Sequence, residues 1–234
     1  MDRSGFLKLI TRELYPVLRA EGFRGSGTTL RRIEEPVIHV FNFQGSTSEH
    51  RCYLNLGAHL SFLPTEGGRG VQPASMLEHQ CVFRGRIHPP PGQSFGWSYG
   101  SSDEEAVENI AFLVSEWSTQ GRLFFDRYSK YPESFITLVS RVNPNEVHAR
   151  DCLHFARIAR QLNMIDRAAT FLNVGLARAP EQATLLRADM AGLLRSLGIN
   201  EPDGKPDSEK AISKIDCAEQ SAAADSGRQG GFSE

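Results

Sequence analysis

The chain has 234 residues, of which 26 are Lys or Arg and 28 are Asp or Glu, giving a formal net charge of −2. This length is enough to bury the core of one or two domains. The near balance of charge argues against general nucleic-acid binding, which needs a basic excess on one face. No uncharged apolar run approaches the roughly 20 residues that span a bilayer, so neither a nucleic acid nor a membrane is an expected partner.

The cysteine spacing and the N-terminal residues bear on the cellular compartment of the protein. Cys52, Cys81, Cys152 and Cys217 are far apart and form no CxxC pair. This spacing favours a reducing, cytoplasmic setting. The first residues, MDRSGFLKLITREL, carry charges throughout and resemble neither a signal peptide nor a membrane anchor.

Residues 4–20 predict an amphipathic helix, because apolar side chains recur at helical spacing. The apolar positions are Phe6, Ile10, Leu14, Val17 and Leu18. Pro16 is expected to kink or restart this helix, since it lacks an N–H donor and clashes with the preceding turn. Gly22 is a suitable C-terminal cap.

Four strands are expected next, over residues 28–34, 37–45, 51–63 and 78–87. Residues 51–63 alternate most clearly, with Cys52, Leu54 and Leu56 on one face and Tyr53 and Asn55 on the other. One apolar and one polar face are typical of an antiparallel sheet that is wetted on one side.

The last of these strands reads EHQCVFRGRI, residues 78–87. Alternation predicts that Cys81, Phe83, Gly85 and Ile87 face the helix and that His79 belongs to the same packed side. Arg84 and Arg86 then point outward together, about 7 Å apart.

Helices follow from residue 102. Ser102 and Glu105 form a capping-box pattern, and Gly121 is expected to end that helix. Further helices are expected over 135–142, 145–163, 166–178 and 181–197, the second of them started by Asn143-Pro144 with Glu146.

The element order predicts an α+β fold: an N-terminal helix packed on an antiparallel sheet of about four strands, followed by a C-terminal helical hairpin region. The expected domains are a sheet domain over 1–130 and a helical region over 131–199. Residues 200–234 are polar and small, and are expected to form a disordered tail.

Several short segments together resemble a family of uncharacterised bacterial domains of the unknown-function type, over about residues 1–130. They are LYPVLRAEGF at 14–23, Thr29 with Arg32, NFQ at 42–44, YLNLG at 53–57 and CVFRGRI at 81–87. The resemblance implies a small soluble domain with a helix on an antiparallel sheet, and it implies no activity.

Residues 149–180 are similar to a single tetratricopeptide-type helical hairpin. The small residues Ala156, Ala168 and Gly175 and the closing Pro180 carry this similarity, while Ala159 stands where the usual aromatic would be. Because stable arrays need about three repeats, one unit favours a helical cap over a peptide-binding solenoid.

Three pairs place a cysteine and a histidine two residues apart: His50 and Cys52, His79 and Cys81, and Cys152 and His154. The first two pairs could each offer a nitrogen and a sulfur to a metal. Buried free cysteines on apolar strand faces are the stronger interpretation, so neither a metal nor another cofactor is expected. No catalytic motif of the GxSxG, P-loop or HExxH type is present.

The polar sheet face remains as the candidate site. Its expected members are Arg84, Arg86, Tyr53, Asn55, His59 and Gln44, with Asn42 if the register allows. Paired guanidinium groups suit an anion or an acidic partner surface, although a solvated face with each arginine paired to a glutamate is the simpler alternative.

Two functions of different classes fit this face. The leading one is a non-enzymatic protein-binding or regulatory protein that holds a protein partner there. The alternative is a hydrolase or transferase on an anionic small molecule, with Arg84 and Arg86 as anion holders and His59 as acid or base. A deep pocket would favour the enzyme and a shallow face the partner; the sequence leaves catalysis and oligomeric state open.

Overall fold

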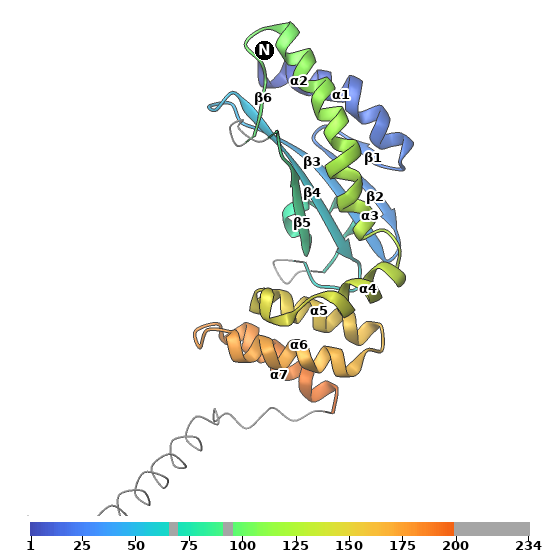
Figure 1. The fold of residues 1–234 in the computed structure, drawn as a ribbon, viewed down its shortest axis with the longest axis vertical. Coiled ribbons are helices and arrows are strands. Elements are labelled where there is room, and N and C mark those ends of the chain that lie inside the picture. Colours follow the sequence, from blue (N-terminus) through green and yellow to red (C-terminus); the bar gives the residue numbers. More distant parts are fainter. Residues whose placement is uncertain (66–69, 91–95, 199–234) are drawn as a thin grey trace, which may run out of the picture.

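The structure is a computed structural model that describes residues 1–65, 70–90 and 96–198. It confirms the α+β class, with an N-terminal helix, an antiparallel sheet and then helices (Figure 1). The expected tail, with Cys217, lies outside the described residues.

The described residues form a six-stranded antiparallel sheet. Its strands are β1 (Arg24–Ser26), β2 (Thr29–Glu34), β3 (Val37–Gly45), β4 (Arg51–Leu60), β5 (Phe83–Ile87) and β6 (Trp97–Ser98). The order is β1-β2-β3-β4-β5, and β6 pairs with β4 beyond the end of β5. The two strands beyond the expected four, β1 and β6, are too short for an alternating pattern.

Helix α1 (Arg3–Ala20) lies on one face of the sheet. Asp2 caps its start, with its carboxylate accepting from the Gly5 N–H at 2.7 Å. The helix runs without a break through Pro16, so the expected restart there is wrong. It ends at Ala20, and Gly22 just beyond it has a φ of +92°, which suits a left-handed cap.

A second helical segment lies beside α1 on the same face. Helix α2 (Asp103–Glu116) continues through a π-helical turn (Trp117–Gly121) into α3 (Arg122–Arg127), and Ser102 caps its start as expected. Gly121 does not end the helix. It allows the Trp117 ring to pack closely, since a Cβ at Gly121 would lie 2.5 Å from that ring.

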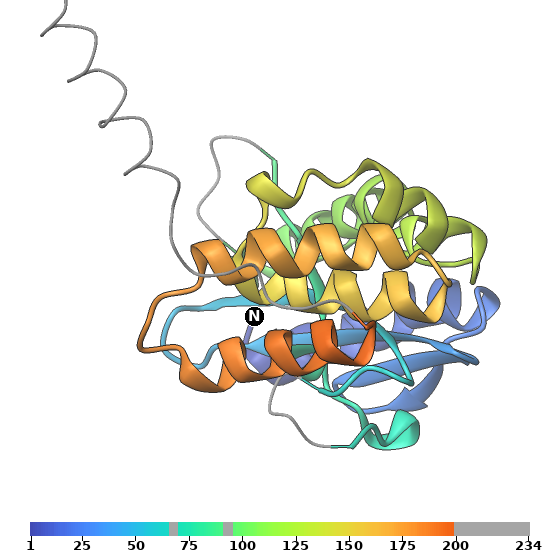
Figure 2. The same ribbon diagram turned by 90° about the horizontal axis from the view of Figure 1, so that it is seen from below.

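The C-terminal helical part, residues 133–196, packs beneath one end of the sheet (Figures 1 and 2). Its helices are α4 (Glu133–Arg141), α5 (Ala149–Gln161), α6 (Ile165–Arg178) and α7 (Thr184–Ser196). Pro144–Glu146 forms only a 3-10 turn, so the expected helix start at Asn143 is wrong and α5 begins at Ala149.

Two apolar cores hold these layers. The first lies between the sheet, α1 and the α2–α3 segment, and includes Phe6, Phe41 and Trp117. The second joins the lower end of the sheet, through Leu60 and Phe83, to α4–α7. The helices therefore bury the end of the sheet as well as one another.

Residues 70–82, the cover segment, lie across the opposite sheet face. Met76 and Cys81 pack there on Ile38 and Val40, and Arg31 Nε donates to the Met76 carbonyl at 2.6 Å. The expected strand over 78–87 is therefore wrong in its first part: Glu78–Gln80 is a 3-10 turn and the strand begins at Phe83. The His79 side chain is 60% exposed and does not belong to a packed side.

Candidate functional site

A row of polar side chains crosses four strands on the face away from α1. Thr29, Asn42, Asn55 and Arg86 are direct partners in successive strand pairs. Because neighbours on one face of a sheet lie within reach of each other, the row is continuous. Its position follows from the alternation within each strand together with the hairpin register of β2 and β3.

Hydrogen bonds connect the row. Arg86 Nε donates to Asn55 Oδ1 at 3.0 Å, and Asn55 Nδ2 donates to Gln44 Oε1 at 3.0 Å. Asn42 Nδ2 donates to Thr29 Oγ1 at 3.1 Å. These bonds hold the amide groups of the row in fixed orientations.

Tyr53 holds Arg86 from the side. The Arg86 guanidinium carbon lies 4.6 Å from the centre of the Tyr53 ring, a cation–π contact. The Tyr53 hydroxyl donates to Glu49 Oε2 at 2.9 Å, and this bond raises the pKa of Tyr53. Arg86 is consequently positioned by both a ring and an amide.

Arg84 differs from its neighbour. Its side chain is exposed on the same sheet face, opposite Gly57 of β4. Within the described chain, its guanidinium forms no hydrogen bond and no ion pair. The simpler alternative, in which each arginine is paired to a glutamate, therefore does not hold for Arg84.

An open hollow of about 880 Å³, here called the sheet hollow, lies over this row. It is lined by Thr28, Thr29, Asn42, Gln44, Asn55, Leu56, Leu77, Glu78, His79, Arg84, Gly85, Arg86 and His88. Glu78 is the one carboxylate among these lining residues, against two guanidinium groups. Leu77, at 37% exposure, adds an apolar contact.

His59 does not belong to this hollow. It lies on the expected face of β4 but is only 1% exposed, because the cover segment lies over it. Its Nε2 lies 3.1 Å from the Leu63 carbonyl, and its Nδ1 accepts from the Val82 N–H at 3.2 Å. The prediction of an outward-pointing His59 is wrong, and both ring nitrogens serve the local backbone.

The cover segment can be tested through Cys81. The Cys81 thiol is fully buried, and burial raises its pKa to about 12. We expect it to react with iodoacetamide at pH 8 at least about a hundredfold more slowly in the native protein than in urea, because thiolate is the reactive form. Mass-spectrometric peptide mapping measures each cysteine separately; equal labelling rates with and without urea would contradict a closed cover segment.

The cysteine–histidine pairs do not assemble into a metal centre. Cys52, Cys81 and Cys152 are buried as free thiols in apolar clusters. Among the residues that the structure describes, no three His, Cys, Asp or Glu side chains come together as ligands.

The sequence-predicted site is thus divided by the fold. Asn42, Gln44, Asn55, Arg84 and Arg86 surround the sheet hollow, and Tyr53 supports it from behind Arg86. Thr29 and Glu78 were missed. The short Glu35-Pro36 turn could have revealed Thr29, because it sets the register that pairs Thr29 with Asn42.

Comparison with known proteins finds one family model that is similar to the part of the chain carrying this surface. Residues 14–116 match the family model "Domain of unknown function (DUF4304)". The resemblance to an uncharacterised domain family is confirmed for this stretch, and the polar row and both arginines lie within the DUF4304 match. No curated protein and no solved structure matches the chain.

The similarity of 149–180 to a tetratricopeptide-type hairpin stays an expectation, because the match ends at residue 116. A bacterial origin stays an expectation as well. Across residues 1–65, 70–90 and 96–198, no helix is both long and apolar enough to cross a membrane.

Proposed function

We propose that this protein is a non-enzymatic binding protein that holds an acidic segment of a protein partner in the sheet hollow. The observation that carries the proposal is the exposed Arg84 guanidinium, which has no partner in the described chain, beside an Arg86 already fixed by Tyr53 and Asn55. Arginine offers a fork of donors that matches a carboxylate, and the fixed amides of Asn42 and Gln44 add polar contacts.

The shape of the hollow supports binding over catalysis. It is open, and Leu77 gives it an apolar edge of the kind that partner surfaces use. The alternative hydrolase or transferase needs a proton-transfer group beside the arginines. His59, expected in that role, is buried and bonded to the backbone, so we favour the binding function.

A charge reversal tests the proposal. Affinity capture from the source cells with wild type, Arg84→Glu and Lys8→Glu identifies any partner that only Arg84→Glu loses. Lys8 is an exposed cation on α1, on the other side of the sheet, and is the matched control.

With the purified partner, we expect Arg84→Glu to weaken binding at least about tenfold, because attraction becomes repulsion. Wild-type affinity should also fall as salt is raised. If Arg84→Glu retains every partner at wild-type affinity, the sheet hollow is not the binding surface.

A further inference from the structure

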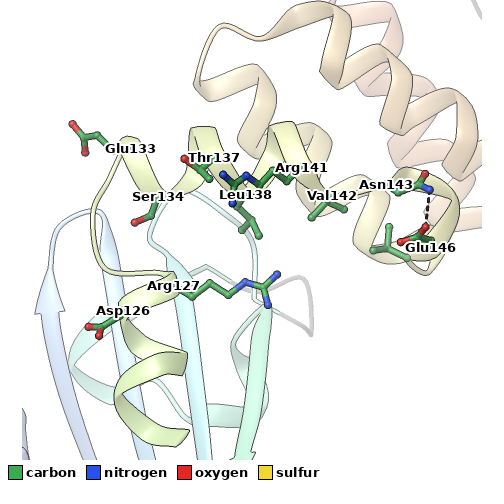
Figure 3. A pocket seen from close by; sticks show the side chains of 11 residues that line it. Asp126, Arg127, Glu133, Ser134, Thr137, Leu138, Arg141, Val142, Asn143 and Glu146 are labelled. Atoms are coloured by element: carbon green, nitrogen blue, oxygen red, sulfur yellow. Dashed lines mark hydrogen bonds between the residues drawn. The ribbon is translucent and has the colours of Figure 1, made fainter. Parts of the chain in front are cut away.

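A second concavity, the junction groove, lies where the α2–α3 segment meets the helices beneath the sheet. It has a volume of about 770 Å³. One wall is the end of α3, the other is α4, and the turn that leads into α5 closes one end (Figure 3). Junctions between structural parts of a chain are common places for ligand sites.

Helix α4 presents one continuous stripe to this groove. Ser134, Thr137, Leu138 and Arg141 all line it, and their spacing of three and four residues places them on one helix face. Leu138 is buried at its floor, while Thr137 and Arg141 are exposed. The stripe therefore combines an apolar floor with two hydroxyl groups and a guanidinium.

Arg127 extends from α3 toward this stripe (Figure 3). Its contact in the described chain is with the neighbouring Tyr128 ring, 5.7 Å from the guanidinium carbon. Neither Arg127 nor Arg141 forms a hydrogen bond or an ion pair with any described residue. Two exposed guanidinium groups from different helices thus share one groove without a counter-charge bound to either.

Three carboxylates also line the groove, but they lie at its ends. Figure 3 shows Asp126 and Glu133 at one end and Glu146 at the other, with Arg127 and Arg141 between them. Glu146 Oε1 accepts a hydrogen bond from Asn143 Nδ2 at 2.9 Å. The centre of the groove is therefore its electropositive part.

The closing turn is held in place from behind. Arg178 Nη1 donates to the carbonyls of Pro144, Asn145 and Val147 at 2.7–3.0 Å. Arg167 also donates to the carbonyls of Val139 and Val142. This end of the groove is preorganised without help from a ligand.

We propose that the junction groove binds a phosphate group between Arg127 and Arg141, with the Thr137 hydroxyl as a further donor. Guanidinium and hydroxyl donors that approach from two helices suit the several oxygens of a phosphate. This site is separate from the sheet hollow and does not rest on the function proposed for it.

The test is an NMR titration of the full chain with inorganic phosphate in phosphate-free buffer. We expect saturable shifts in residues 126–147. Arg127→Gln/Arg141→Gln should weaken binding at least about tenfold, as expected for loss of charge-assisted hydrogen bonds. The control variant Lys8→Gln/Arg12→Gln also removes two positive charges, but from exposed positions on α1, and it should bind phosphate with the wild-type affinity.

Two further variants keep the result decisive. Thr137→Val retains both arginines and should weaken binding by about two- to tenfold, so a folding defect of the double arginine variant does not end the test. Arg84→Gln should bind phosphate as wild type does. A glycerol 3-phosphate arm and a phosphoserine-peptide arm separate a small-molecule source from a phosphorylated partner, and tighter binding of either supports the site.

Three outcomes overturn the proposal: no saturable shifts in 126–147, wild-type affinity in the double arginine variant, or loss of binding in Arg84→Gln. The last outcome would place the phosphate in the sheet hollow. Failure of the sheet-hollow partner experiment leaves this titration unaffected, because the variants and the readout differ.

Discussion

Replacement of Trp117 by alanine is expected to lower the free energy of unfolding by about 3–5 kcal/mol. Trp117 is fully buried in the π-helical turn, and its ring lies 5.8–5.9 Å, centre to centre, from Phe23, Phe41 and Phe125. Its indole Nε1 also donates to Glu21 Oε1 at 3.1 Å. Urea denaturation followed by circular dichroism measures this loss of stability. The control is Phe112→Ala, at a ring that is 47% exposed, which should lower the free energy of unfolding much less.

A double-mutant cycle tests whether the close packing of the Trp117 ring requires a glycine at position 121. Gly121→Ala should destabilise the wild type, because the added Cβ would lie 2.5 Å from the Trp117 ring. In the Trp117→Ala background that clash is absent, and the same change should be neutral or stabilising through helix propensity. If Gly121→Ala lowered the free energy of unfolding equally in the wild type and in Trp117→Ala, the Trp117 ring would not be the reason for glycine at position 121.

Acidification is expected to destabilise the protein through His39. Burial first, and then the Arg32 guanidinium, lower the pKa of His39 to about 3, although the contact with the Tyr128 carbonyl acts in the opposite direction. Arg32 Nε donates to His39 Nδ1 at 3.1 Å, and His39 Nε2 lies 3.1 Å from that carbonyl. The neutral imidazole can satisfy both contacts, whereas the imidazolium cannot accept from arginine.

The direction of the pH effect follows from proton uptake. Below pH ~6.5 an unfolded histidine binds a proton, while folded His39 stays neutral down to pH ~3. The unfolded state therefore binds one more proton in this window. The stability contribution is complete above pH ~6.5 and is lost as the pH falls towards ~3, at about 1.4 kcal/mol per pH unit and on the order of 5 kcal/mol in all.

Urea denaturation at a series of pH values from 7 to 4 tests this effect. His39→Gln cannot be protonated and should make the slope of unfolding free energy against pH shallower by about one proton. His79→Gln, at a side chain that is 60% exposed, should leave the slope unchanged. Parallel slopes for wild type and His39→Gln would contradict a neutral, buried His39; carboxylate titration is common to all three proteins and cancels in the comparison.

Local patterns predicted the elements best where turn signals bounded them. The strand over 37–45 agrees with β3 at both ends, because Glu35-Pro36 precedes it and a Gly-Ser turn follows it. Alternation predicted that Asn55, Arg84 and Arg86 point away from the helix and that Asn42 and Gln44 share one face of their own strand. The register of the strands, which alternation left open, brings all five residues around one hollow. Whether they bind a partner stays a prediction.

The predictions that failed depended on how the chain packs in three dimensions, which local patterns do not show. Alternation gives the side of a sheet to which His59 points, but not that residues 70–82 cover that half of the face. Gly121 has the sequence signal of a helix end, yet the Trp117 ring four residues earlier uses its missing side chain. The junction groove was not predicted, because it depends on how the chain turns between Arg127 and Glu133.

The two cores also have a consequence for anyone who shortens this protein. The DUF4304 match begins at Leu14 and stops at Glu116, but the upper core needs Phe6 and Ile10 before it and Trp117 and Phe125 after it. The lower core needs α4–α7 to cover Leu60 and Phe83. A fragment trimmed to residues 14–116 would thus carry the polar row on a sheet whose apolar face is only partly covered and whose lower end is open to water, and such a fragment is prone to aggregate. The segment that matches the family model is therefore shorter than the segment needed to complete both cores.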